Sequence, residues 1–269
     1  MNIDSHQHFW IVGKFDYPWM SPKLGPLYRD FLPSDLEPLL PKAGIQQTIL
    51  VQASPSVAET DWFLELAAHN EFIAGVVGWL DLEAVDFAKQ FEQYRKKSKF
   101  VGIRPAVEFI SDDNWLATPR VIESLKIVEA ADFPFDLIIW PRHLPTVLRM
   151  LTHVPDLRCV VDHLAKPDVK NKQLEPWRTH MAELARHPNV LCKLSGLDSA
   201  DRSVVRPFVD QVVASFGPRR VMYGSDWPVS LRVCSYEESV GLIRETAASV
   251  PEKDLLGGTA ARFYKLPVV

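Results

Sequence analysis

Short apolar runs alternate with amphipathic segments along the whole chain, and this alternation constrains the fold more than any other feature. The apolar runs are rich in valine and isoleucine, and most of them are continuous rather than alternating in polarity. Continuous runs of this length are typical of strands that are buried on both faces of a parallel sheet. We predict eight strands, over Met1–Phe9, Gln47–Ala53, Ile73–Trp79, Phe100–Val107, Phe135–Trp140, Leu157–His163, Val190–Leu194 and Arg220–Gly224.

The segments between these runs have a helical pattern. Their apolar residues recur every three or four positions, as in helices that cover one face of a sheet. We predict helices over Glu59–Asn70, Val85–Lys97, Pro119–Ala131, Leu144–His153, Pro176–His187, Arg206–Phe216 and Tyr236–Val250. Ser34 and Glu37 have the spacing of a capping box, which predicts a short helix that ends near Pro41 and Gly44.

Eight strand–helix pairs predict an α/β fold with one (β/α)8 TIM-barrel domain over residues 1–269. Such barrels typically need about 250 residues, and the chain has 269. A doubly wound open sheet is the alternative, but no Gly-x-Gly-x-x-Gly sequence follows any of the runs. The proline-rich stretch Ile11–Pro33 has no helical pattern, and we expect an ordered loop there that could cover the site.

Composition narrows the classes of partner. The net charge is −4 and the basic residues are scattered, which argues against nucleic acid. No apolar run reaches the roughly 18 residues that a membrane span needs, and the first residues lack the pattern of a secretory signal. Cys159, Cys192 and Cys234 are odd in number and far apart, so we expect free thiols. We therefore expect a cytoplasmic protein with a small-molecule partner, and a homo-oligomer is compatible with the sequence.

Histidines and an aspartate lie where strands of the predicted barrel end. Barrel active sites lie at the carboxyl ends of the strands. His6 and His8 are two residues apart in the first run, so both imidazoles face the same side of a strand. His163 closes the sixth run, and Asp226 follows the eighth. We predict that these four residues lie together as catalytic residues and as a metal site.

The chemistry of these residue types points to hydrolysis. His6, His8 and Asp226 suit one divalent cation, such as zinc or manganese, that would polarise a carbonyl and lower the pKa of a bound water. Asp226 would be either a ligand or the base for the attacking water, and His163 would complete the ion's shell or polarise the substrate carbonyl. Because no nucleotide-binding loop is present, hydrolysis at a carbonyl fits better than hydride or phosphoryl transfer.

Cationic and aromatic residues recur at the same strand ends and are candidates for substrate binding. The cations could hold a carboxylate, a polyol or a developing oxyanion, and the aromatic side chains suit a ring such as a sugar lactone. The candidates are Trp10, Trp79, Arg104, Trp140, Arg142, His143, Lys166, Lys193, Ser195 and Trp227. Each also has a structural alternative: the tryptophans could only pack, Arg104 and Lys193 could be ion-paired inside the barrel, and Asp226 could cap a helix.

Six motifs occur in order along nearly the whole chain: IDSHQHFW (3–10), GVVGWLDL (75–82), DHLAKP (162–167), CKLSGL (192–197), YGSDWPV (223–229) and GTAARFY (258–264). Together they resemble the amidohydrolase superfamily, in its branch of sugar and muconate-type lactonases. That branch includes L-fuconolactonases and L-rhamnonolactonases and is related to 2-pyrone-4,6-dicarboxylate lactonase. The resemblance implies a (β/α)8 barrel that hydrolyses a lactone, with Asp226 as general base and His6, His8 and His163 around a metal or the lactone carbonyl. Some members of the branch need no metal, so the metal is expected to be dispensable in part of the family.

One position departs from the family pattern, which often has Gly-Ile-Arg-His where this chain has Gly102-Ile103-Arg104-Pro105. The change removes a donor that could touch the substrate, so the chemistry carries over better than the substrate does. Three other functions stay open: a metal-dependent decarboxylase of the same superfamily, a hydrolase of a non-sugar ester or lactone, and a catalytically silent barrel that binds a sugar acid or a partner protein. The intact set of His6, His8, His163 and Asp226 counts against the last.

Overall fold

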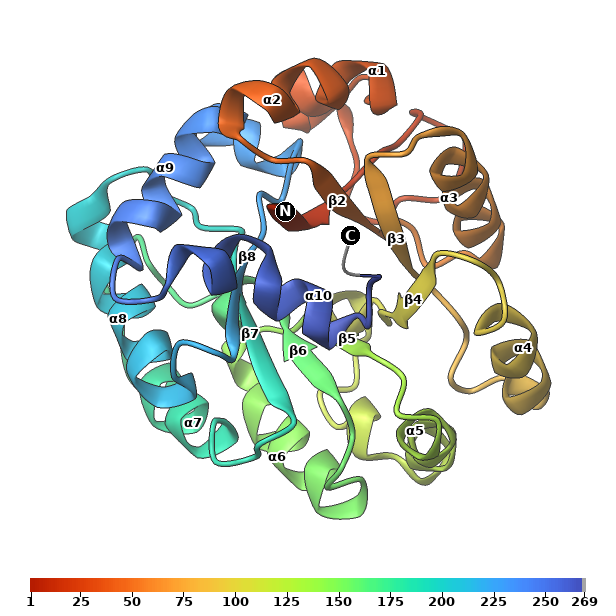
Figure 1. The fold of residues 1–269 in the computed structure, drawn as a ribbon. Coiled ribbons are helices and arrows are strands. Elements are labelled where there is room, and N and C mark those ends of the chain that lie inside the picture. The colour runs from red at the N-terminus through yellow and green to blue at the C-terminus, as the bar shows by residue number, and fades with distance from the viewer. Residues whose placement is uncertain (268–269) are drawn as a thin grey trace.

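Eight parallel strands pair in chain order and curl into a barrel in the computed structural model, which describes residues 1–267 (Figure 1). The strands are β1 (Ile3–Gln7), β2 (Gln47–Val51), β3 (Ile73–Gly78), β4 (Phe100–Ile103), β5 (Phe135–Leu137), β6 (Cys159–Val161), β7 (Val190–Leu194) and β8 (Val221–Tyr223). A parallel bridge between Gln7 and Trp227 joins the last strand's end to the first, with His8 N donating to Trp227 O at 2.7 Å. The prediction of a (β/α)8 barrel is confirmed, and the open-sheet alternative is excluded.

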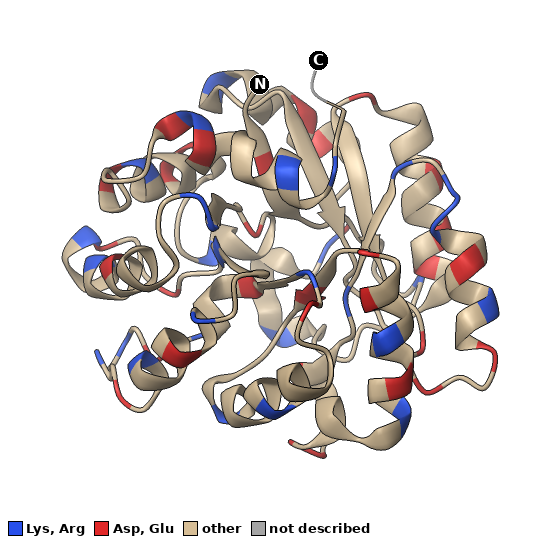
Figure 2. Cartoon of the chain, turned by 60° about the horizontal axis from the view of Figure 1, so that its bottom comes forward, with Lys and Arg blue, Asp and Glu red and all other residues tan. Residues whose placement is uncertain are grey.

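Helices surround the barrel in the order expected for repeated strand–helix units (Figure 1). They are α1 (Pro33–Leu36), α2 (Leu40–Ala43), α3 (Val57–His69), α4 (Phe87–Tyr94), α5 (Pro119–Ala130), α6 (Leu144–His153), α7 (Trp177–Leu184), α8 (Arg202–Phe216), α9 (Tyr236–Thr246) and α10 (Thr259–Phe263). None of the helices within residues 1–267 is both long enough and apolar enough to cross a bilayer. Basic and acidic residues are interspersed along the outer helices (Figure 2), in agreement with the scattered charge of the sequence.

Several predicted helix starts differ from the structure: the helices predicted from Glu59 and Val85 begin at Val57 and Phe87, and two other starts differ because of local caps. The helix predicted from Arg206 begins at Arg202, because Asp201 accepts a hydrogen bond from Ser203 N and caps the chain there, and Pro207 lies inside the helix. The short helix predicted from Ser34 begins at Pro33, and the Asp35 carboxylate accepts from Leu32 N at 2.9 Å. The capping box therefore does not involve Ser34 and Glu37.

The segment from Ile11 to Pro33 forms the predicted ordered cover. Trp10 and Phe31 exchange backbone hydrogen bonds of 3.0 and 2.9 Å and so fasten the two ends of the loop. Trp19 Nε1 donates to Ala53 O at 2.8 Å, which ties the middle of the loop to the chain after β2. The loop includes a 3₁₀ segment, η1 (Pro22–Leu27).

The barrel interior differs at its two ends. At the end where the strands begin, Ile3, Val77, Val160 and Met222 form an apolar cluster with residues of α10, and Figure 1 shows α10 lying across this end. The other end is closed by polar and charged side chains. Since strands of a barrel share one direction, all the carboxyl-end side chains meet there.

Candidate active site

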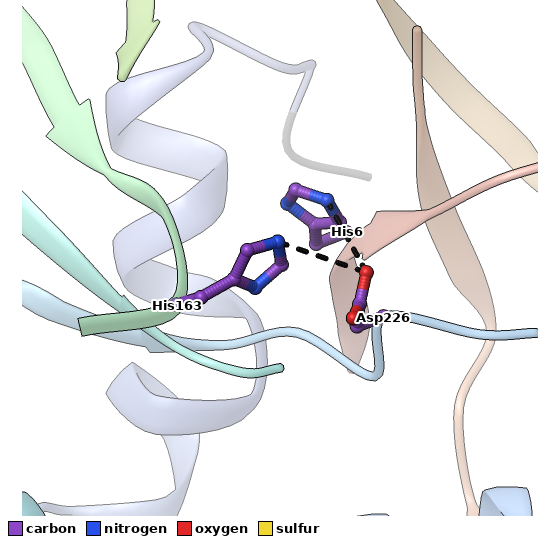
Figure 3. A group of neighbouring side chains, drawn as sticks. All are labelled: His6, His163 and Asp226. Atoms are coloured by element: carbon purple, nitrogen blue, oxygen red, sulfur yellow. Dashed lines mark ion pairs between the residues drawn. The ribbon is translucent and has the colours of Figure 1, made fainter. Parts of the chain in front are cut away.

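The four residues predicted to form the site converge at the carboxyl end of the barrel. His6 lies in β1 and His8 just after it, His163 lies in the 3₁₀ segment η6 (Asp162–Ala165) after β6, and Asp226 follows β8. Asp226 Oδ1 lies 3.3 Å from His8 Nε2, 3.7 Å from His163 Nε2 and 3.8 Å from His6 Nε2. Figure 3 shows His6 and His163 turned toward this carboxylate. All four are almost fully buried.

The far nitrogens of the rings have their own partners. His8 Nδ1 lies 2.7 Å from Val51 O, and because a carbonyl only accepts, Nδ1 donates to it and Nε2 is left to face the site. His163 Nδ1 lies 2.8 Å from Ser195 Oγ. These contacts fix the ring orientations so that the Nε2 atoms face Asp226.

The backbone around His163 and Asp226 is strained. His163, Leu164, Ala165 and Lys166 all have φ between 50° and 59°, and Asp226 has φ of 57°. Left-handed backbone costs a residue with a Cβ about 1 kcal/mol or more, and such strain gathers at functional sites. Gly196 allows the arrangement, because a Cβ there would lie 2.4 Å from His163 Nδ1.

Burial sets the protonation of the histidines. It lowers the pKa of His163 to about 4 and the pKa of His6 well below its usual range, so both rings are neutral at pH 7. Burial by itself would raise the pKa of Asp226, but the three facing imidazoles reverse this, and its pKa is lower than usual. The site therefore presents neutral nitrogen donors around an ionised carboxylate.

Directly beneath lies a group of buried ion pairs, which we call the buried charged layer: Arg104, Asp136, Asp162 and Lys193. Lys193 Nζ lies 2.5 Å from Asp136 Oδ2 and 3.0 Å from Asp162 Oδ1, and Arg104 lies 3.0 Å from Asp162 Oδ2. The layer touches the site through His6, whose Nδ1 lies 3.2 Å from Lys193 Nζ and 3.3 Å from Asp162 Oδ1. Although burial raises the pKa of Asp162, the facing cations outweigh it and keep this carboxyl ionised.

A pocket of about 380 Å³ opens above Asp226. Of the residues predicted to bind substrate, Arg104, Trp140 and Lys166 line it. Five further residues that were not predicted to bind substrate also line the pocket: Trp19, Gln52, Glu108, Asp198 and Arg232. Trp19 lies in the loop predicted as a cover, and the other four come shortly after β2, β4, β7 and β8, so their place after strand ends was the signal that could have found them.

The other candidates for substrate binding do not line this pocket. Trp10 is fully buried against Trp19 and Phe31, and Trp227 packs against Phe9 and Phe31. The backbone of Trp79 is held by Thr60. The structural alternative, packing, therefore describes Trp10 and Trp227, because the covering loop encloses them.

The remaining polar candidates form hydrogen bonds or ion pairs outside the pocket lining. Arg142 forms an exposed ion pair with Asp113 at 2.9 Å, and His143 Nδ1 accepts from Trp140 N at 3.1 Å. Ser195 contacts His163 as described, and Lys193 lies in the buried charged layer. None of the four reaches the cavity wall, so their contacts position other side chains. Pro105 is also buried away from the wall, between Arg104 and Ala106, which both line it.

The donor set fits a divalent metal. His6, His163 and Asp226 each offer one ligand atom, and these atoms lie within 4.8 Å of one another. His8 Nε2 is 3.1 Å from His6 Nε2 and next to the same carboxylate. Neutral imidazoles with one carboxylate suit zinc or manganese.

A family model described as Amidohydrolase matches residues 3–266. The chain belongs to the amidohydrolase family. Among its curated relatives, an L-fucono-1,5-lactonase from Burkholderia ambifaria is 39% identical over 98% of this chain and 95% of its own length. An L-fucono-1,5-lactonase from Burkholderia multivorans is 36% identical over 99% of this chain and 97% of its own length.

Solved amidohydrolase structures agree with the fold of this one. A crystal structure of an amidohydrolase from Burkholderia multivorans with bound zinc superposes with a TM-score of 0.93 at 36% identity, and covers 99% of this chain and 100% of that chain.

Proposed function

We propose that this amidohydrolase opens the lactone ring of a small sugar acid, with L-fucono-1,5-lactone as the first candidate substrate. The observation that carries the proposal is the Asp226 carboxylate facing the imidazoles of His6, His8 and His163 at the floor of the pocket. The near full-length similarity to L-fucono-1,5-lactonases supports the choice of substrate. The pocket volume of about 380 Å³ is in the range of small-ligand sites.

The arrangement supports a simple division of labour. Asp226 takes a proton from water as the water attacks the lactone carbonyl, and returns that proton to the ring oxygen as the ring opens. His163, held by Ser195, and the Arg104 guanidinium stabilise the charge that develops on the carbonyl oxygen. A divalent ion held by His6, His163 and Asp226, with His8 beside them, would polarise the carbonyl and lower the pKa of a bound water.

Three further properties are part of the proposal. Zinc or manganese is the metal that the donor set favours, and the rate without metal decides whether it is required. We also propose a cytoplasmic location, because all three cysteines are free thiols. A homo-oligomer remains a prediction from sequence.

A panel of aldonolactones and muconolactones, with and without chelator, tests the function directly. Opening a lactone at neutral pH yields an ionised acid and releases a proton, which a pH indicator detects. We expect rapid proton release from L-fucono-1,5-lactone and none above background from Asp226→Asn. Silence of the wild-type protein across the panel with metal bound would contradict the proposal.

Decarboxylation, the alternative predicted from sequence, gives a different product. It releases carbon dioxide, so the same reactions are analysed for gas evolution with aromatic carboxylates as substrates. Acyclic esters are included to separate ring opening from general ester hydrolysis.

A further inference from the structure

Three successive barrel loops bring a carboxylate, an aromatic ring and an ammonium group to one wall of the pocket. Glu108 lies in the 3₁₀ segment η3 (Val107–Phe109) after β4, Trp140 follows β5, and Lys166 follows η6. Lys166 Nζ donates to Glu108 Oε2 and lies 4.8 Å from the centre of the Trp140 ring. We call these three residues the recognition wall.

The wall is attached to the catalytic floor and partly desolvated. Lys166 N donates to His163 O at 2.7 Å, so the position of the ammonium group is tied to a residue of the site. The Glu108 side chain is 13% exposed and that of Lys166 is 22% exposed, whereas Trp140 is 38% exposed. Charge interactions are stronger there than in bulk water.

Each cation that lines the pocket within residues 1–267 already faces a carboxylate. Arg104 lies 3.0 Å from Asp162, Arg232 lies 3.7 Å from Asp198, and Lys166 pairs with Glu108. A substrate carboxylate would have to displace one of these partners and would meet the repulsion of its charge. A hydroxyl group donates and accepts at once, so it can bond to both members of an intact pair.

We infer that the recognition wall selects neutral polyhydroxylated lactones over lactones that carry an additional carboxylate. Hydroxyl groups donate to Glu108 and accept from Lys166, and the C–H face of the sugar ring packs against Trp140. Glu108 supplies the rejection, because its charge both occupies Lys166 and repels a second anion. This inference rests on the proposed lactonase function and names the substrate class of the same site.

The test compares two lactones that differ in one group: an aldono-1,4-lactone and the aldaro-1,4-lactone of the same stereochemistry, which has a carboxylate in place of the terminal CH₂OH. We expect wild-type kcat/KM to favour the neutral lactone. Glu108→Gln lowers kcat/KM for the neutral lactone about tenfold and raises it for the aldaro-lactone about tenfold, because one charged hydrogen bond is lost and Lys166 is freed.

Lys166→Gln separates recognition from folding. It leaves Glu108 without its cation, so we expect kcat/KM for the aldaro-lactone to fall about tenfold further than for the neutral lactone. The two variants thus change the preference in opposite directions, whereas a merely structural role would change both alike. Unchanged preference in Glu108→Gln, or a change of the same sign in both variants, would overturn the inference.

Glu92→Gln is the matched control, because Glu92 on helix α4 pairs with Lys96 at 3.0 Å and with Arg95, and all three side chains are exposed. We expect the preference of this variant to equal that of the wild type. A change as large as that of Glu108→Gln would mean that any lost surface charge alters the preference, and would overturn the role of the wall.

Equilibrium binding makes the inference independent of turnover. Calorimetry with a neutral 1,5-anhydro-6-deoxyhexitol and with its carboxylate counterpart measures recognition by ligands that cannot be opened. If the wild type opens neither lactone, the proposed function fails, while binding still decides the inference. Tighter binding of the neutral ligand that is lost in Glu108→Gln supports it, and equal binding or no binding of both ligands contradicts it.

Discussion

The buried charged layer and the recognition wall both join a lysine to carboxylates, yet they differ in burial and in the kind of chain that holds them. Lys193 is fully buried on a strand and meets two carboxylates, whereas Lys166 is 22% exposed on a loop and meets one. Two chain segments contribute to both groups: the segment after β4 carries Arg104 and Glu108, and η6 with the residue that follows it carries Asp162 and Lys166.

The difference in burial separates charged residues that support the barrel from charged residues that can bind a ligand. A buried charge is tolerated only when its partners stay in place, so Lys193, Asp136 and Asp162 support His6 without contacting a substrate themselves, and Arg104 is the one member of the layer that lines the pocket. The wall keeps partial access to solvent, so hydroxyl groups of a ligand can replace water there at a small cost. Asp162 and Lys166 are only four residues apart, yet Asp162 keeps buried partners whereas Lys166 can exchange its contacts with a ligand.

The largest expected effect concerns Asp226, which lies between the two groups. Asp226→Asn keeps the shape of the side chain and removes the base, so we expect turnover to fall about 10³-fold to 10⁴-fold. Initial rates of lactone opening measure this, and circular dichroism checks the fold. Turnover within a factor of a few of the wild type would remove Asp226 from the role of base.

The next effect compares the two lysines directly. Lys193→Met leaves Asp136 and Asp162 buried without that cation, so we expect the free energy of unfolding to fall by about 3–5 kcal/mol. Lys166→Met breaks a partly exposed pair and should lower it by no more than about 1 kcal/mol. Urea denaturation measures both. Equal losses in the two variants would abolish the distinction between layer and wall.

Metal retention tests whether the floor above the layer holds an ion. The double variant His6→Ala with His8→Ala removes two nitrogen donors, and we expect it to lose bound zinc or manganese by at least about a hundredfold in affinity. Metal analysis after loading and dialysis measures the loss, and His153→Ala, at the end of α6, serves as control. Unchanged metal content in the double variant would place the ligands elsewhere.

A smaller effect is expected for Glu59, a buried carboxyl group that accepts hydrogen bonds from the backbone and changes how the free energy of unfolding depends on pH. Glu59 accepts from Ala53 N and Ser54 N, each at 2.9 Å, and burial raises its pKa to about 8. Between the unfolded value of 4.5 and about 8, the folded state keeps a proton that the unfolded state has lost. Stability contributed by Glu59 is therefore present below pH 4.5 and is lost as the pH rises through 8.

Glu59→Gln removes this titration. From pH 5 to pH 8.5 we expect the wild type to lose at least about 1 kcal/mol more of its free energy of unfolding than the variant does. Urea denaturation at both pH values measures the difference. Parallel pH dependence of the two proteins would mean that Glu59 is ionised throughout, like Asp162.

The sequence by itself determined the barrel and which four side chains meet at its carboxyl end. The strands were found because continuous apolar runs report burial on both faces, a property of the local chain. His6 and His8 were placed on one side of β1 because strand side chains alternate. Asp226 and His163 followed because parallel strands bring their carboxyl ends to one face. The helix starts predicted at Ser34 and Arg206 were wrong. The side chains of Asp35 and Asp201 cap these helices, and the spacing of apolar residues does not report such caps.

Only the tertiary structure decided which side chains at the strand ends reach the pocket. Trp10 and Trp140 both follow strands, but the covering loop encloses Trp10, whereas Trp140 faces the cavity beside Lys166. The sequence placed Lys193 inside a strand and allowed either substrate binding or ion pairing, and its place below His6 depends on Asp136 from another strand. The physical reason is that the direction and burial of a side chain beyond a strand end are set by loops and partners distant in sequence, which no local pattern reports.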